Sequence, residues 1–330
     1  MRNLFEYKNN FDKYHNVKSI LLYGDTSQCM NPQITVVMPV FGNPRFFVDA
    51  FESVINQETD VVYEVVIVDN TPLDEKKSDI LCFLEKSEYP NVFYYRNETN
   101  IGMMGNWNRG ILLARAELIT FCHDDDMLYP FCLSRLWELH AKYPNKFIIS
   151  AVRNIDENIH YPLDASIDSH SFWGRECYAY DKLDIFMGNP TNGEGCLFYR
   201  QHMLEMGGYN EEYYPSSDNA IHIKYIFQYG AMYYRHTLFC YRISSGNTSH
   251  TVYKGFISNG LFYCECMAHK IHLPKFLISK LTHAFLTKIT INSEQTWGNA
   301  GIQAVTPTLS DRLIYKFLSW RNRMKKMGIL

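Results

Sequence analysis

Apolar runs of strand length alternate with helical patterns between residues 34 and 122, and this alternation constrains the fold more than any other feature. The strand-like runs are residues 34–40, 63–70, 92–95 and 118–122. The stretches with apolar side chains at helical spacing are residues 45–57, 74–87 and 103–114. Continuous apolar strands separated by helices are typical of a mostly parallel sheet with helices on both faces. The pattern therefore predicts an α/β fold.

Three segments directly follow strands of this predicted sheet. They are residues 39–41, the pair Asp69 and Asn70, and residues 123–126. In open parallel sheets, ligands bind beyond the carboxyl ends of the strands. We therefore expect the three segments to lie side by side along one edge of the sheet and to form the ligand site.

Three consecutive aspartates, Asp124, Asp125 and Asp126, are the strongest local signal for chemistry. Adjacent carboxylates repel each other, and a bound divalent cation removes that repulsion. Mg²⁺ and Mn²⁺ favour oxygen ligands and share their shell with substrate phosphates. The alternative interpretation is a solvated acidic turn or the N-cap of the following helix, where Asp is favoured.

Outside the alternating stretch the patterns are less regular. Residues 1–33 are polar and aromatic without a clear period. Beyond residue 251 the chain has a helical pattern, with a break at Pro274. The predicted organisation is an N-terminal extension (1–33), a main α/β domain (34–250) and a helical C-terminal region (251–330).

Charge and composition exclude several classes of protein. The 32 Lys and Arg residues against 35 Asp and Glu residues give a net charge of -3, so a general basic field for nucleic acid is absent. No apolar run reaches the roughly 18 to 20 residues of a membrane-spanning helix, and residues 1–10 lack the apolar core of a signal peptide. Nine cysteines without a C-x-x-C pair indicate reduced thiols and a cytoplasmic protein.

The first two motifs resemble family 2 glycosyltransferases with the GT-A fold, a Rossmann-like fold of nucleotide-diphospho-sugar transferases. Residues 34–57 contain Pro39, Val40 and Phe41 after the first strand and a helix that closes in Ser-Val-Ile-Asn-Gln, as in the opening of that family. Residues 65–70 are similar to the strand whose terminal Asp meets the nucleotide base. Here Asp-Asn-Thr-Pro replaces the usual Asp-Asp-Gly-Ser.

The third and fourth motifs follow in the family's order. The residues 100–114 match its spacing of Asn-x-Gly, a second Asn, a second Asn-x-Gly and Ala. Residues 121–130, Phe-Cys-His-Asp-Asp-Asp-Met-Leu-Tyr-Pro, are similar to its segment with paired aspartates. In that register Asp125 and Asp126 are the pair and His123 replaces the first Asp. In a simple Asp-x-Asp register Asp124 and Asp126 are the pair, so Asp126 is common to both.

The fifth motif, residues 207–218, is similar to the family's Gly-Gly-Phe-Asp-Glu segment that ends in Glu-Asp, with Ser217 in place of Glu. In this alignment Asp218 matches the catalytic base of inverting members. A base there would take the proton of the acceptor hydroxyl as that oxygen attacks the anomeric carbon. Taken in isolation, Asp218 is better explained as the N-cap of a helix over 219–229, and the five motifs in order reverse that preference. The resemblance covers residues 34–245.

The resemblance implies a site with four kinds of residue. The donor-binding residues would be Pro39, Val40, Phe41, Asp69, Asn100, Gly102, Asn106 and Asp125. The ligands of Mn²⁺ or Mg²⁺ would be Asp126, Asp124 and His250. The acceptor-binding residues would be Asn192, Glu194 and Trp173. The catalytic residue would be Asp218.

Five residues keep plainer interpretations. His123 is either a further metal ligand or a capping and packing residue, and His250 is either a metal or diphosphate contact or an ordinary exposed histidine. Trp173 stacks on a sugar ring or packs in the core. Asn192 and Glu194 contact the acceptor or are turn residues.

The last 20 residues differ in charge from the rest of the chain. Residues 311–330 contain six basic residues and one acidic residue, a local charge of 6 − 1 = +5, with apolar residues at partly helical spacing. A basic amphipathic helix can lie on an anionic membrane surface. The alternative is a helix packed on its own domain with a solvated basic face.

The sequence thus predicts a metal-dependent, inverting, hexosyltransferase-type glycosyltransferase. The expected donor is a nucleoside-diphosphate sugar, linked to uridine. The expected acceptor is a hydroxyl of a growing glycan, such as a bacterial surface polysaccharide or a lipid-linked oligosaccharide. The protein would be cytoplasmic, with peripheral contact at the inner face of the plasma membrane and no nucleic-acid partner. Two rivals are a metal phosphohydrolase that uses the aspartates and a non-catalytic nucleotide-sugar-binding module.

Overall fold

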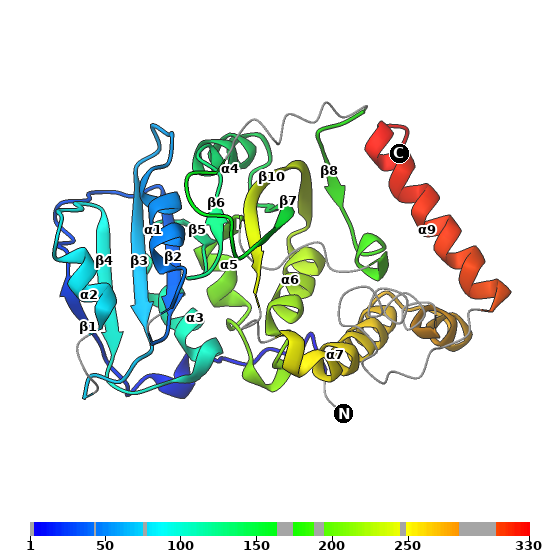
Figure 1. Cartoon of the computed structure of the whole chain (residues 1–330). Helices are drawn as coiled ribbons and strands as arrows, with labels where there is room; N and C mark the ends of the chain where they lie inside the picture. Colours follow the sequence, from blue (N-terminus) through cyan, green and yellow to red (C-terminus); the bar gives the residue numbers. More distant parts are fainter. Residues whose placement is uncertain are drawn as a thin grey trace.

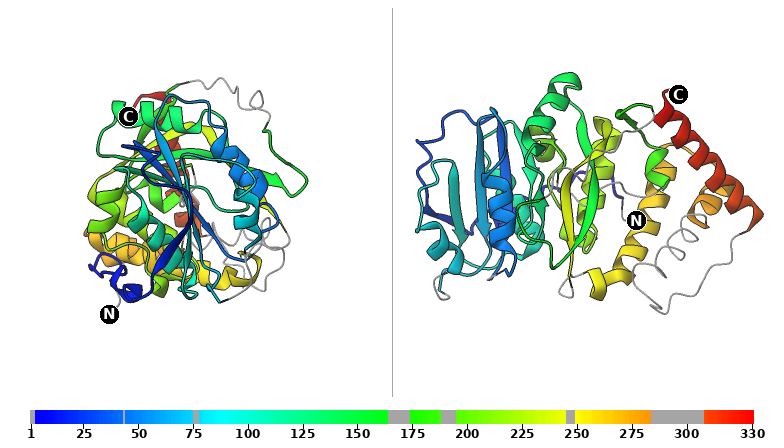
Figure 2. Two further views of the ribbon diagram at one scale, coloured as in Figure 1. Left: turned by 90° about the vertical axis from the view of Figure 1, so that its left-hand side faces the viewer. Right: turned by 45° about the horizontal axis from the view of Figure 1, so that its top comes forward.

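The computed structural model describes residues 3–42, 44–74, 78–163, 174–187, 195–244, 249–283 and 308–330, without the side chains of 249–253 and Tyr315. Two β-sheets lie next to each other with helices around them (Figure 1). Strand β1 (Ser19–Tyr23) and helix α9 (Leu309–Met327) lie at opposite ends of the molecule, and a second view shows the same arrangement (Figure 2).

The first sheet has six strands in the order β1-β4-β3-β2-β5-β9. The other five are β2 (Ile34–Val40), β3 (Tyr63–Asp69), β4 (Val92–Asn97), β5 (Leu118–Phe121) and β9 (Phe198–Tyr199). The four inner strands are parallel, and both edge strands run antiparallel to their neighbours. The mostly parallel sheet expected from the sequence is confirmed. Its β1 edge is supplied by residues of the predicted N-terminal extension.

Strand β2 is buried along its whole length because helices cover both faces of the sheet. Val36 and Met38 share one apolar core with helices α1 (Phe47–Ile55), α2 (Asp79–Leu84) and α4 (Cys132–Lys142). Val37 belongs to the other core, with α3 (Gly102–Leu113). Successive side chains of a strand point to opposite faces, so a strand covered on both sides is apolar at most positions. The exception in β2 is Thr35, whose buried hydroxyl donates to Glu64 at 2.7 Å.

Helix α3 packs closely against β2 through Gly110. A Cβ at Gly110 would come within 2.2 Å of Val37 Cγ1. The helix also ties down the N-terminal extension, because the Arg109 guanidinium donates to the carbonyls of Tyr14 (2.9 Å) and Val17 (2.7 Å). These contacts fix α3, which contains most of the third sequence motif, against one face of the sheet.

The second sheet is centred on the long strand β10 (Ala231–Ile243). It pairs in parallel with β7 (Phe147–Asp156) and antiparallel with β6 (Met127–Leu128) and β8 (Cys177–Tyr180). Because β6 follows β5 after residues 122–126, the chain passes from the first sheet to the second through the aspartate segment. The three aspartates therefore lie where the two sheets meet.

The remaining helices lie on the second sheet and beyond it. They are α5 (Arg200–Glu205), α6 (Ser217–Gln228), α7 (Ser249–Lys270), a helix over residues 275–283, and α9, with short 3-10 turns η1 (Asp12–Tyr14), η3 (Asp184–Met187) and η4 (Glu211–Tyr213). Helix α9 begins with a capping box between Thr308 and Asp311 and ends at Gly328, which has φ 79°. None of the helices in the described ranges is both long and apolar enough to span a membrane.

Candidate active site

The carboxyl ends of β2, β3 and β5 meet at one edge, as the sequence predicts for a parallel sheet. Val40 is in register with Asp69, and the Asn70 amide donates to the Val40 carbonyl at 2.9 Å. On the other side of β2, the Cys122 amide donates to the Val37 carbonyl at 3.0 Å. The three segments singled out by the sequence therefore lie side by side.

Asp69 is fully buried at the end of β3. One carboxylate oxygen accepts a hydrogen bond from the Tyr94 hydroxyl at 2.5 Å, and the other accepts from the Thr71 amide at 2.8 Å. Burial, together with the Asp69 charge, raises the pKa of the Tyr94 phenol, so that hydroxyl remains a donor. Thr71 in turn accepts at Oγ1 from the Gly42 amide at 2.8 Å, which joins the loops after β2 and β3.

Four asparagines bind one another behind this edge. Asn97 Nδ2 donates to Asn70 Oδ1 (3.1 Å) and to Asn106 Oδ1 (2.9 Å), and Asn70 Nδ2 donates to Asn100 Oδ1 (2.8 Å). Asn106 Nδ2 also donates to the carbonyl of Val68 at 2.8 Å. Asn100, Gly102 and Asn106, which the sequence assigned to donor binding, thus lie beside Asp69. They hold the start of α3 against the end of β3.

The aspartate segment lies between β5 and β6. Burial and then the neighbouring Asp125 charge raise the pKa of Asp124 to about 7, against the opposing effects of His123 and of the Phe41 backbone. The Asp124 carboxylate therefore adjoins both Asp125 and the end of β2. Phe41 itself is 57% exposed and offers its ring to any molecule at this edge.

Asp126 differs from its neighbours because it is buried, with 1% of its surface exposed. Its Oδ1 accepts a hydrogen bond from the backbone amide of Arg242 at 2.8 Å. This contact joins the aspartate segment to the end of β10, 116 positions later in the chain.

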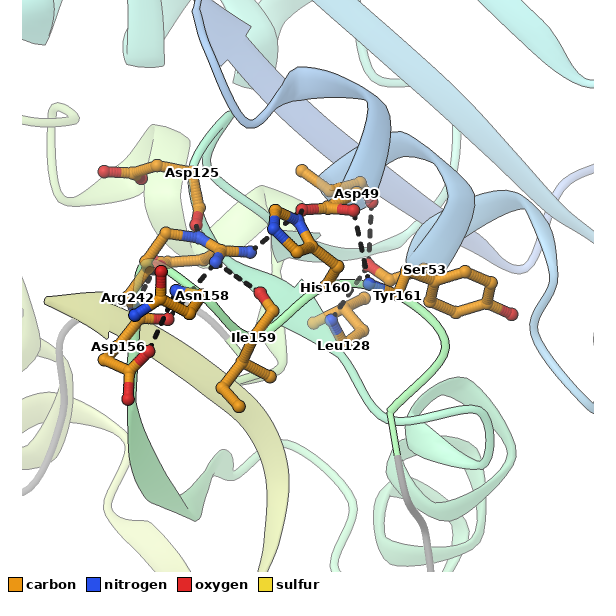
Figure 3. A network of polar contacts seen from close by, with 12 residues as sticks. Asp49, Ser53, Asp125, Leu128, Asp156, Asn158, Ile159, His160, Tyr161 and Arg242 are labelled. Atoms are coloured by element: carbon orange, nitrogen blue, oxygen red, sulfur yellow. Dashed lines mark hydrogen bonds and ion pairs between the residues drawn. The ribbon is translucent and has the colours of Figure 1, made fainter. Parts of the chain in front are cut away.

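The Arg242 side chain is completely buried and forms the centre of a polar network (Figure 3). Its Nε donates to the Asp125 carbonyl (2.8 Å), and one terminal nitrogen donates to the carbonyls of Ile159 (2.5 Å) and Asp156 (3.4 Å). The other terminal nitrogen lies 3.3 Å from Asp49 Oδ2 of α1. The guanidinium also lies over the Phe46 ring, 4.2 Å from its centroid.

Asp49 extends this network to the segment after β7 (Figure 3). His160 Nδ1 lies 2.7 Å from Asp49 Oδ2, and the Tyr161 amide donates to Asp49 Oδ1 at 3.2 Å. Neither Arg242 nor Asp49 was identified from the sequence. The available signal was an arginine directly after the run Leu-Phe-Cys-Tyr (238–241), which needs internal acceptors if it is buried.

His123 packs against aromatic rings. Its ring centroid lies 4.7 Å from that of Trp107, which in turn lies 5.0 Å from the Tyr209 ring. Asn108 holds Tyr209 by two hydrogen bonds, from Nδ2 to its carbonyl and from its amide to Oδ1, both 2.8 Å. The third and fifth sequence motifs therefore contact each other directly. Packing is the observed environment of His123.

Asp218 lies in the first turn of α6 and is partly exposed. Ser216 occupies the N-cap position, and the Ser217 hydroxyl donates to the Asn210 carbonyl at 2.6 Å. Asp218 is therefore not the N-cap of this helix, which was the plainer interpretation of its sequence position. Its role as the base stays a prediction.

The structure does not describe the side chains of the four remaining predicted site residues. Trp173, Asn192 and Glu194 lie outside the described residues, and His250 lies on α7 but its side chain is not described. Among the described residues, no group of three or more His, Cys, Asp or Glu side chains is arranged to hold a metal ion.

The carboxylates of the aspartate segment are suited to supply part of the ligand shell of a divalent cation. Asp124 and Asp125 are consecutive residues in the segment after β5, and the Asp125 charge raises the pKa of Asp124. Such hard oxygen donors suit Mg²⁺ or Mn²⁺ when substrate phosphates supply further ligands. Oδ1 of Asp126 already accepts from Arg242.

Fold and site together define a GT-A glycosyltransferase architecture. The structure of S. aureus TarS in complex with UDP-GlcNAc superimposes with a TM-score of 0.57 at 14% identity, covering 89% of this chain and 81% of that chain. At this identity the likeness establishes the fold. The sequence pattern of glycosyl transferase family 2 matches residues 35–207, and the chain belongs to that family of transferase enzymes.

Curated relatives match part of the chain. An uncharacterized protein of Mycobacterium tuberculosis, MT1568, is 26% identical over 59% of this chain and 64% of its own length. The GalNAc(5)-diNAcBac-PP-undecaprenol beta-1,3-glucosyltransferase of Campylobacter jejuni is 25% identical over 56% of each chain. The minor teichoic acid biosynthesis protein GgaB of Bacillus subtilis is 26% identical over 37% of this chain and 13% of its own. The chain thus spans less than two thirds of each of these relatives.

Proposed function

We propose that this protein is an inverting glycosyltransferase that moves a sugar from a uridine-diphosphate donor to a hydroxyl of a growing glycan. The observation that carries the proposal is the shared edge of β2, β3 and β5, where the aspartate segment adjoins Phe41 in a member of glycosyl transferase family 2. TarS, which shares the fold, has a structure with UDP-GlcNAc. This supports a uridine-linked donor.

The donor would lie along this edge. In the proposed complex, Pro39, Val40 and Phe41 flank the base on one side and Asp69 flanks it on the other. The Asp69 carboxylate accepts two hydrogen bonds within the protein, fewer than the roughly four that a carboxylate can accept. Because Asp69 is fully buried, the donor would reach it only if the loops after β2 and β3 move apart. Asn100, Gly102 and Asn106 keep the start of α3 next to it. Asp125 would face the ribose.

Divalent cations are typical of GT-A enzymes, and the aspartates would hold one here. Asp124 and Asp126, with His250 as a further candidate, would bind Mn²⁺ or Mg²⁺ together with the donor diphosphate. The bound cation supplies positive charge that stabilises the departing diphosphate. Within the protein, Arg242 fixes this segment by donating to the Asp125 carbonyl and to the Asp126 carboxylate.

Asp218 would act from the acceptor side. Its carboxylate would take the proton from the acceptor hydroxyl while that oxygen forms a bond to the anomeric carbon and the bond to the diphosphate breaks. Attack opposite the leaving group inverts the anomeric configuration. We also propose that Asn192, Glu194 and Trp173 contact the acceptor, although they lie outside the described residues.

The acceptor would belong to a surface polysaccharide or a lipid-linked oligosaccharide. The named relatives include a teichoic acid biosynthesis protein and a glucosyltransferase of an undecaprenol-linked glycan. We accordingly propose a cytoplasmic enzyme that acts at the inner face of the plasma membrane.

Thermal-shift screening of UDP-sugars with and without Mn²⁺ tests the donor. We expect one UDP-sugar to raise Tm by several degrees in the presence of Mn²⁺, as binding to the folded state requires. An absence of stabilisation by every nucleoside diphosphate would overturn the proposal. Phosphate release without an acceptor would instead favour the phosphohydrolase.

Replacing Asp218 tests the mechanism separately from binding. Asp218→Asn should lower kcat on the order of 1000-fold, the range of lost general-base catalysis, and leave the Kd of the donor unchanged. Glu212→Gln, an exposed neighbour that pairs with Lys8, is the matched control and should keep full activity. Transfer at the normal rate in Asp218→Asn would remove Asp218 from the mechanism. Donor binding without transfer in the unmodified protein would favour a binding module.

A further inference from the structure

Helix α9 has two faces with different chemistry. The inward face carries Asp311, Leu318 and Lys325, all buried, and Arg321, which pairs with Asp181 and Asp184. The outward face carries four apolar side chains whose exposed fractions are 76% for Leu309, 59% for Leu313, 57% for Phe317 and 53% for Trp320. The basic residues exposed on that outward face are Arg312, Lys316 and Arg323.

The outward residues form two adjoining stripes. At about 100° per residue, the four apolar side chains fall within roughly 80° of arc, and the three basic ones fall within roughly 40° directly beside them. Phe317 and Trp320 touch, with ring centroids 6.2 Å apart. We call these seven residues the outward face of α9.

The rest of the molecule holds this face outward. Helix α9 forms the outer border of the molecule at the end opposite β1 (Figures 1 and 2). Arg321 and Lys325 both pair with Asp181 and Asp184 near η3, and the Arg175 amide donates to the Lys326 carbonyl at 2.8 Å. Because these contacts fix the rotation of the helix about its axis, the apolar stripe cannot turn inward without breaking them.

We propose that the outward face of α9 docks the protein on the surface of an anionic phospholipid bilayer. Apolar side chains beside a basic stripe are the arrangement of helices that lie in the plane of a membrane surface. Each of the three cations would approach the anionic headgroups while Phe317 and Trp320 enter the boundary with the acyl chains. The docking follows from the geometry of α9 and does not require the proposed transferase activity.

The charge of the face favours a bilayer over a second copy of the chain. Asp311 is the only acidic residue of α9, and it is buried, where it binds Thr308 and His283. A two-fold pair of outward faces would bring the same three cations of each copy together without an acidic partner from α9. An anionic bilayer complements both stripes at once.

Vesicle co-sedimentation of the full chain tests this proposal. We expect binding to vesicles of phosphatidylcholine with 30% phosphatidylglycerol, as an approximate composition that gives a negative surface, and no binding to pure phosphatidylcholine. The variant Arg312→Gln/Lys316→Gln/Arg323→Gln should bind on the order of 100-fold more weakly. Phe317→Ser/Trp320→Ser should bind these vesicles roughly tenfold more weakly or worse, because less apolar area enters the bilayer.

A matched control removes three positive charges elsewhere. Lys18, Lys86 and Lys142 are exposed outside α9, and their triple Gln variant should bind vesicles like the unmodified chain. Equal losses in the control and in the outward-face triple variant would overturn the proposal, as would no binding of the unmodified chain. A dimer that Phe317→Ser/Trp320→Ser abolishes, without vesicle binding, would also overturn it and assign the face to a second copy.

Tryptophan fluorescence tests the proposal with a single conservative substitution, in case the multiple variants fold poorly. Anionic vesicles should shift tryptophan fluorescence to the blue, and Trp320→Phe should remove most of that shift while keeping an aromatic side chain at the same place. An unchanged shift in Trp320→Phe would show that α9 does not enter the bilayer.

Discussion

At the scale of single residues, burial shifts the pKa of polar side chains and thereby sets their charge. His222 of α6 is completely buried and packs against the rings of Phe147 and Phe198, with centroids at 5.1 and 5.5 Å. Burial lowers its pKa to about 3, so the ring stays neutral in the folded protein. In the unfolded chain the same imidazole titrates near its ordinary pKa of about 6.5.

This shift predicts a loss of stability in acid. Between pH 6.5 and 3 the unfolded state binds a proton that the folded state does not, so the free energy of unfolding falls as the pH is lowered through this window. At pH 5 the loss from His222 is about 2 kcal/mol. Urea denaturation at pH 7.5 and pH 5 should show that His222→Phe lacks this part of the decrease.

An exposed histidine provides the comparison for that measurement. His269 is exposed on α7, and His269→Gln should show the same decrease as the unmodified protein. If His222→Phe loses as much stability between the two pH values as the unmodified protein, then His222 is not the group responsible.

At the scale of elements, Arg242 joins parts that local sequence patterns treat separately. Its backbone and side chain bind the segment between β5 and β6, the segment after β7 and helix α1. The sequence predicted strands β2, β3 and β5 and the segments at their carboxyl ends that lie along one edge. It did not reveal that the end of β10 fixes the aspartates, because a contact across 116 positions leaves no local periodicity.

Arg242→Lys should loosen both attached segments. A single ammonium cannot reproduce the planar guanidinium fork, so several of the four side-chain hydrogen bonds are lost. We expect the free energy of unfolding to fall by about 2 to 4 kcal/mol. Hydrogen exchange should increase at residues 123–128 and 156–161. Arg135→Lys, which alters an exposed pair with Glu138, should change stability by less than about 0.5 kcal/mol. Unchanged exchange at both segments would contradict this positioning role.

At the scale of the whole molecule, buried ion pairs attach the last helix. Lys325 is 6% exposed and Asp184 is 2% exposed, and both belong to the group with Arg321 and Asp181. Two cations therefore face two carboxylates between α9 and η3. Each charge needs its partners, because a buried charge without a counter-ion is strongly destabilising.

Asp184→Asn should release α9 from the domain. The variant leaves two cations facing one carboxylate. We expect this to destabilise the packing of α9 on the domain by about 3 kcal/mol. Hydrogen exchange at residues 309–327 should rise while β2, β3 and β5 keep their protection. Glu138→Gln, which breaks an exposed pair, should leave that protection unchanged. Equal protection in both variants would show that the ion pairs do not hold the helix.

The sequence by itself determined the parallel sheet, because a strand buried on both faces must be apolar at most positions. It also determined which residues end the strands, and therefore the edge where Asp69 and the aspartates lie. Only the tertiary structure decided that His123 packs on Trp107, that Arg242 holds Asp126, and which basic residues of α9 pair inward or remain exposed. Periodicity reports the burial of one face locally, whereas these contacts depend on how two sheets and distant helices pack together.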